Sequence, residues 1–245
     1  MKKYGLGYIL GIAASVVIIT GLYYFYSWFY LWSPTPEWEK SPQNRVITIG
    51  EMWTEVDYNY IPDLQIWGDG YIVWVEHLSD GNRKVFEGYL SQQEMTSLIQ
   101  KIIGLDFFER NRKSKDYAGT FITVSLIGAS RSEWLDPDNK QLYDFATYLK
   151  MGAGTTGKEL IPTVGTFFAI PIEKTWLPTN TKANYHWSDD KFGYSLDTLT
   201  DKSDGKEISG DELKFAWKVV NSPLSTIESK GKVYWVAVVL PKVSQ

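Results

Sequence analysis

The chain has 245 residues, with 25 Lys and Arg against 29 Asp and Glu, two His and no Cys. The absence of cysteine excludes disulfides, thiolate nucleophiles, cysteine-ligated zinc and a cysteine-linked lipid anchor. Hydrophobic residues make up 44% of the chain and aromatic residues 16%, which indicates a folded protein and not a disordered one. The formal charge of −4 gives no electrostatic basis for nucleic-acid binding, so we expect no nucleic-acid partner.

An uncharged apolar segment follows the two N-terminal lysines. Residues 6–32 supply more than the roughly 20 apolar residues that a helix needs to cross the hydrocarbon core. Because a backbone in lipid must satisfy its own hydrogen bonds, we predict a single transmembrane helix over 6–32. Aromatic residues crowd its C-terminal third, as at a membrane–water interface, and Pro34 and Pro36 cannot continue it.

The orientation of this helix follows from Lys2 and Lys3, because basic residues favour the cytoplasmic side. Residues 1–5 are therefore predicted to be a cytoplasmic tip, and the rest of the single-pass chain to lie outside the cell membrane. A cleaved signal peptide is the alternative, but its apolar core is shorter, about 7–15 residues, and ends in small residues. Aromatic residues stand in that place here, so we favour an uncleaved signal-anchor.

Beyond a polar linker, which we place at residues 33–44, the sequence predicts an α+β fold: an antiparallel sheet with about three packed helices. Turn residues at 68–70 and 80–82 join neighbouring strand patterns into a meander. In the first half of the chain, strands are predicted at residues 45–50, 64–67, 71–76, 84–89, 120–126 and 131–135.

Three helices are predicted at residues 90–103, 140–150 and 210–221. Ser91 with Glu94, and Ser209 with Glu212, match the capping-box pattern at the starts of the first and third helices. Two more strands are predicted at 166–172 and 232–240. Pro171 suggests that the first of these is an edge strand, and the apolar run of the second suggests a central, buried strand.

The glycine-rich residues 151–157 are interpreted as a flexible connector between two regions. Residues 45–151 form one α+β subdomain in this interpretation, and residues 152–245 form a second subdomain or continue the first. The segment also matches the start of a phosphate-binding P-loop, but Glu159 stands where a magnesium-binding Ser or Thr belongs. Because it also follows a predicted helix and not a strand, the connector is favoured.

The only ligand-spaced motif lies at residues 201–212, which resemble an EF-hand calcium loop. Asp201, Ser203 and Glu212 occupy ligand positions, and Glu207 would contribute its backbone carbonyl. A glycine and a lysine occupy the fifth and sixth positions, where a ligand and an invariant glycine belong. These departures favour the alternative, an exposed turn that leads into a helix, and calcium is the only cofactor that the sequence suggests.

Three tryptophans are candidate ligand-binding residues. Trp67 and Trp74 flank the first predicted turn, where exposed rings would stack on a sugar or a partner protein. The alternative is that both rings pack across neighbouring strands and stabilise the sheet. Trp187 is the third candidate, because carboxylates at Asp189 and Asp190 follow it closely.

One group of motifs supports a resemblance over residues 60–150. It consists of a hairpin with a central Asp-Gly, a Ser-x-x-Glu helix that begins at Ser91, and the stretch from Gly104 to Phe108 ahead of another strand. This arrangement resembles uncharacterised bacterial extracytoplasmic domains, which are secreted or membrane-tethered. The resemblance implies a structural class only, since its motifs include no catalytic residue.

Two functional hypotheses remain open from the sequence. The first is a non-enzymatic accessory or protein-interaction module whose partner lies in the membrane or envelope, with an aromatic-rich sheet face as the contact surface. The alternative is an extracytoplasmic enzyme or ligand-binding domain acting on envelope carbohydrate. Its carboxylates would come from Glu76, Asp189 and Asp190, and its stacking ring from Trp187.

Overall fold

A computed structural model describes residues 37–51, 61–108, 119–172, 185–199, 205–241 and 243. From Glu37 onward the chain belongs to one compact unit. The predicted cytoplasmic tip at 1–5, the predicted transmembrane helix at 6–32 and the first part of the predicted linker lie outside the described residues. Within the described residues, no helix is both long enough and apolar enough to span a membrane.

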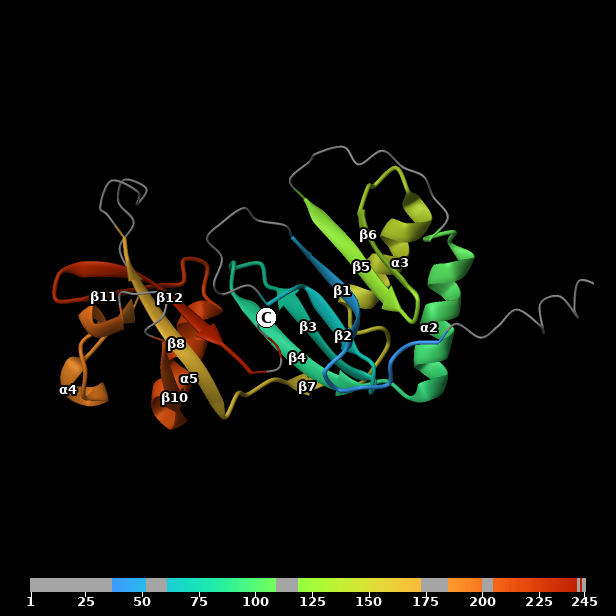
Figure 1. Ribbon diagram of the computed structural model, residues 1–245. Helices are drawn as coiled ribbons and strands as arrows, with labels where there is room; N and C mark the ends of the chain where they lie inside the picture. Colours follow the sequence, from blue (N-terminus) through green and yellow to red (C-terminus); the bar gives the residue numbers. More distant parts are fainter. Residues whose placement is uncertain are drawn as a thin grey trace, which may run out of the picture. The chain divides into compact units, whose positions relative to one another are not determined.

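The fold is mixed α+β, and it contains two sheets where the sequence predicted one (Figure 1). The first sheet is antiparallel, with seven strands in the order β6-β5-β1-β2-β3-β4-β7. These strands are β1 (Arg45–Glu51), β2 (Leu64–Trp67), β3 (Tyr71–His77), β4 (Arg83–Tyr89), β5 (Thr120–Leu126), β6 (Ala129–Trp134) and β7 (Lys158–Glu159).

Two helices cover one face of the first sheet, α2 (Gln92–Gly104) and α3 (Lys140–Lys150). Their buried residues, among them Ile99 and Phe145, share a core with Ile66 and Ile72 of the sheet. The alternate residues of β2 and β3 face the other side and join a second core with residues of the C-terminal half. Because both faces of these strands are covered, nearly every residue in them is buried.

The two predicted capping boxes have different outcomes. At the start of α2, Ser91 N donates to Glu94 Oε2 at 2.6 Å and Glu94 N donates to Ser91 Oγ at 3.2 Å, which confirms the first. The second helix with this pattern is α5 (Gly210–Val220), where Ser209 is the N-cap residue but makes no side-chain capping bond. The second box was therefore wrong, because the Glu212 carboxylate accepts a hydrogen bond from Tyr194 instead.

These two serines give a matched pair for mutation. Ser91→Ala removes a capping bond and is expected to lower the free energy of unfolding by about 1 kcal/mol. Ser209→Ala removes no side-chain capping bond and is expected to have a much smaller effect. Urea denaturation of the full chain in mild detergent measures both, and equal losses for the two variants would contradict the assignment.

The second sheet has five strands in the order β10-β8-β12-β11-β9. All its pairs are antiparallel except the short parallel pair of β9 with β11. Helix α5 packs on one face of this sheet through Leu213, Ala216 and Val219, and the 3₁₀ helix η2 (Leu196–Leu199) packs on the same side. The strands are β8 (Val164–Pro171), β9 (Tyr185–His186), β10 (Lys206–Ser209), β11 (Thr226–Ser229) and β12 (Lys232–Val239).

The positions of β8 and β12 test two sequence predictions. Strand β12 is the central strand, as predicted, but it is not buried along its whole length, because Trp235 is 46% exposed. The prediction that β8 is an edge strand was wrong, since β8 pairs with β10 on one side and β12 on the other. However, β10 pairs only with Val164–Phe167, so Pro171 lies beyond it and its missing N–H interrupts no pairing with β10.

The glycine-rich segment after α3 packs closely against Trp74. A Cβ on Gly157 would lie 1.9 Å from Trp74 Cη2, and one on Gly152, whose φ is +83°, would lie 2.9 Å from the same ring. Glycine is therefore required here by close approach, and the segment is not a loose connector. The chain then adds β7 to the first sheet and passes to the second sheet between β7 and β8.

Residues 37–44, which we predicted to be part of a polar linker, pack against the first sheet. Trp38 is buried, and its Nε1 donates a hydrogen bond to Gly68 O at 3.0 Å. The backbone of Glu37 accepts a hydrogen bond from Ile127 N at 3.0 Å. The single apolar residue Trp38 explains the difference, because burying its large ring fixes the polar residues around it.

Candidate functional site

The structure buries Trp67 and Trp74 on opposite faces of the first sheet. Trp67 is 2% exposed and lies 5.1 Å from the Tyr71 ring, whereas Trp74 is 4% exposed and stacks on Phe86 at 5.5 Å. Trp74 pairs with Leu64, which lies three residues before Trp67 on β2. Because successive strand residues point to opposite faces, Trp67 and Trp74 lie on opposite faces of the sheet. Neither ring offers an exposed face to a ligand, and both stabilise the two cores.

Trp187, the third candidate ligand residue, is also buried, at 7% exposure. It stacks on Phe167 at a centroid distance of 5.4 Å with an interplanar angle of 9°, and its Nε1 donates to Tyr194 O at 3.0 Å. Phe192 and Phe215 close the rest of the cluster. Trp187 is thus the centre of an aromatic core under the second sheet.

The three candidate carboxylates do not converge. Glu76 is an exposed residue of β3 in the first sheet, opposite Lys84 in the strand register. Asp189 and Asp190 begin α4 (Asp189–Phe192), beside the second sheet. Asp189 Oδ2 lies 2.5 Å from Lys230 Nζ, and this hydrogen bond holds the pKa of Asp189 below its usual range. A carboxylate held ionised in this way is unsuited to act as a general acid.

The predicted calcium loop is only partly described, because Asp201 and Ser203 lie outside the described residues. Glu207 belongs to β10, where it pairs with Thr166 of β8 in an extended ladder. The Glu212 carboxylate accepts a hydrogen bond from Tyr194 OH and lies 3.6 Å from Lys206 Nζ. An extended strand and an already paired Glu212 do not match a loop that curls around a cation. Among the described residues, no three His, Asp or Glu side chains gather as a metal site would require.

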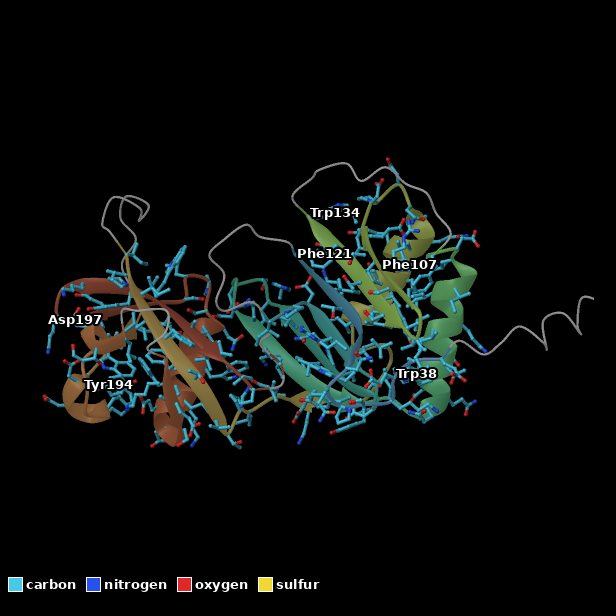
Figure 2. All side chains as sticks on the ribbon, viewed as in Figure 1. Trp38, Phe107, Phe121, Trp134, Tyr194 and Asp197 are labelled. Atoms are coloured by element: carbon cyan, nitrogen blue, oxygen red, sulfur yellow. The ribbon has the colours of Figure 1, made fainter. Side chains whose placement is uncertain are left out.

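Among the residues that the structure describes, three tyrosines donate hydrogen bonds to carboxylates. They are Tyr71, which donates to Glu87 at 2.7 Å, Tyr234, which donates to Asp197 at 2.7 Å, and Tyr194 (Figure 2), which donates to Glu212. Burial, followed by the hydrogen bond and the charge of the neighbouring carboxylate, raises the pKa of each phenol. Lys206 Nζ also lies 3.3 Å from the centroid of the Tyr194 ring, a cation–π contact.

These raised pKa values predict a loss of stability in alkali. Above about pH 10 the unfolded chain releases phenolic protons that the folded chain retains, so the free energy of unfolding falls as the pH rises. Below that pH the contribution is fully present. Urea midpoints measured between pH 8 and pH 11 should fall more steeply in the natural sequence than in Tyr194→Phe. Parallel pH profiles would contradict the role of Tyr194.

An open groove of about 420 Å³ lies between the first turns of α2 and the segment that follows α3. Glu94 lines it, but its carboxylate is engaged with Ser91, and those hydrogen bonds lower the pKa of Glu94. The remaining lining residues are Ser91, Gln93, Ser97, Leu98, Tyr148, Ala153 and Gly154. This groove brings no acid–base pair together.

The second sheet has an apolar face on the side opposite α5. Trp235 of β12 pairs with Ile170 of β8 in the register, and Ala237 pairs with Phe168. These residues alternate along their strands with core residues such as Phe167 and Val236, so they point away from the core. We call this surface the outer face; it consists of Val164, Thr166, Phe168, Ile170, Ile172, Val233, Trp235, Ala237 and Val239. It is partly covered, because Ala237 is only 4% exposed and Gly205 packs against Phe168 and Thr166.

Trp235 is the most exposed aromatic residue of the outer face, at 46%. No charged residue lies among the outer-face positions of β8 and β12, but one acidic residue lies on each flank. Glu207 is on β10 opposite Thr166, and Glu228 is on β11 opposite Val233. The strand patterns at 166–172 and 232–240 were visible in the sequence, but nothing in them indicated which alternate residues would point away from the core.

Comparisons with known proteins do not assign this arrangement to a family. No protein-family model, no curated protein and no solved structure matches the chain.

Proposed function

We propose that this chain is a membrane-anchored accessory protein whose extracytoplasmic domain binds a protein partner through the outer face of the second sheet. The observation that carries this proposal is the apolar outer face, with Trp235 nearly half exposed at its centre. Contiguous exposed apolar surface marks interaction sites, and tryptophan is enriched among the residues that dominate binding energy. The predicted helix at 6–32 would hold the domain at the cell membrane with its N-terminus in the cytoplasm.

The flanks of the outer face indicate the chemistry of the partner. Glu207 and Glu228 place negative charge on either side of an uncharged apolar strip. A complementary partner carries an apolar helix or sheet face with basic residues on its two sides. We therefore infer a basic, amphipathic partner segment from a protein of the membrane or envelope.

The experiment replaces Trp235 with a photoreactive benzoylphenylalanine in the full chain and illuminates intact membranes. Tyr143 of α3 is the matched control position, because its exposure of 44% is close to the 46% of Trp235. We expect a discrete protein adduct from position 235 and none from position 143. With the identified partner purified, Trp235→Ser should weaken binding at least tenfold, and Tyr143→Ser should not.

Three outcomes would overturn this proposal. An adduct with twice the chain's mass of 28.1 kDa would show that the outer face binds a second copy. Labelling of lipid alone would show that it rests on the bilayer. Equal adducts from positions 235 and 143 would show that the outer face has no special role.

A further inference from the structure

The part of the first sheet formed by β5 and β6 carries a second, chemically different surface. On the side away from α2 and α3, Thr123 Oγ1 and Ser132 Oγ lie 2.7 Å apart, and Ser125 Oγ and Ser130 Oγ lie 3.1 Å apart. Both pairs are exposed. The alternate residues of β5, Ile122 and Val124, point to the opposite side and are fully buried in the core.

An aromatic pair ends this row of hydroxyls. Phe121 and Trp134 pair across β5 and β6, with ring centroids 6.1 Å apart and an interplanar angle of 77° (Figure 2). The strand register places both rings on the same side of the sheet as the hydroxyl pairs. We call the six residues Phe121, Thr123, Ser125, Ser130, Ser132 and Trp134 the hydroxyl strip.

None of the six side chains of the hydroxyl strip is charged. The charged residues of β6, Arg131 and Glu133, lie opposite Val124 and Ile122 in the register and so point to the core side. Their guanidinium and carboxylate groups form an ion pair of 3.1 Å there. The six side chains of the strip offer no charge to a ligand, so they favour an uncharged ligand over an anion or a polybasic segment.

The chemistry of the hydroxyl strip suits a neutral sugar chain. Each hydroxyl pair uses one of its two protons internally, so one donor and several lone pairs in each pair stay free for a ligand. Sugar hydroxyls both donate and accept, and the apolar faces of sugar rings stack on aromatic rings. We propose that the hydroxyl strip binds a neutral polysaccharide, with Trp134 and Phe121 as the stacking end and the four hydroxyls as the polar track.

This inference is independent of the outer face, which lies on the other sheet. The test uses the full chain in mild detergent and two uncharged probes, insoluble chitin and insoluble cellulose. We expect the chain to sediment with at least one of them, and the two probes distinguish acetamido sugars from plain glucose. Because the hydroxyl strip has no charge, raising the salt from about 0.05 to 0.5 M should leave the bound fraction unchanged.

Two variants separate binding from folding. Trp134→Ala should lower the affinity at least fivefold. Thr123→Val with Ser132→Val removes one hydroxyl pair but keeps residues that favour strands, and it should lower the affinity at least threefold with no loss of thermal stability. Trp235→Ser on the outer face should bind the polysaccharide normally, so a failure of one proposal is distinguishable from a failure of the other.

The proposal is overturned if neither chitin nor cellulose retains the chain. It is also overturned if both strip variants bind as well as the natural sequence, or if salt abolishes the binding. In the first two cases the hydroxyl pairs and the aromatic pair only stabilise the sheet, and in the third a charged surface elsewhere is responsible.

Discussion

Gly157→Ala is expected to lower the free energy of unfolding by about 3 kcal/mol, the upper end of the usual cost of overpacking a core. A Cβ at this position would lie 1.9 Å from Trp74 Cη2 and 2.9 Å from the backbone oxygen of Glu87. Trp74 has no free space to move into, because its ring is 4% exposed and stacks on Phe86. The backbone around residue 157 must therefore shift and disturb the pairing of β7 with β4.

Gly104→Ala provides the control for this prediction. Gly104 is the last residue of α2, and a Cβ there would meet no heavy atom within 4 Å. Alanine has a higher helix propensity than glycine, so we expect this variant to be neutral or more stable by up to about 1 kcal/mol. Urea denaturation measures the stability of both variants. If the Gly157→Ala protein were as stable as the natural one, the Trp74 ring would be able to move aside for the added Cβ, which would contradict the prediction.

Removal of residues 243–245 is expected to cost about 3 kcal/mol, although a few terminal residues of most domains can be removed with little effect. Val243 is buried in the core that joins the first sheet to the C-terminal half. Its backbone oxygen accepts a hydrogen bond of 2.7 Å from Nε2 of Gln65, a fully buried residue of β2. The deletion exposes apolar surface and also leaves a buried amide without its partner.

A double-mutant cycle with Gln65→Met separates these two contributions. In the Gln65→Met background no amide is left unpaired, so the same deletion should cost about 1–2 kcal/mol less. Thermal unfolding of the four proteins in mild detergent gives the coupling between the two changes. A zero coupling would show that the Gln65 amide does not hold the C-terminal segment.

Local patterns determined the elements of this protein. The predicted strands at 64–67 and 120–126 and the helix at 140–150 coincide with β2, β5 and α3. Strand alternation, helical periodicity and turn glycines involve residues within about ten positions of one another, so they can be recognised in the sequence alone. The shortest elements, such as β7 and β9 with two residues each, are too short to show a periodic pattern of apolar residues, so the sequence did not predict them.

Similar sequence patterns have different roles in the folded protein, because residues far away in the chain contact them. Ser91 with Glu94 and Ser209 with Glu212 are the same capping signature, yet only the first forms. Tyr194 approaches Glu212 from 18 positions away along the chain and takes its carboxylate. Likewise, Trp67 and Trp74 flank one turn in sequence, but each is buried in a different core. The fate of the candidate site residues therefore depended on contacts that no local pattern contains.

The sequence by itself determined an α+β composition and the location of most strands and helices, because these follow from short-range periodicity. Only the tertiary structure decided that the strands divide into two sheets, with β1 inserted between β2 and β5. It alone also decided which faces are covered: α5 packs on one face of β8 and β12 and leaves Trp235 on the other. The alternation of side chains along a strand shows that the strand has two faces. Which face packs against a helix depends on contacts between segments far apart in the chain.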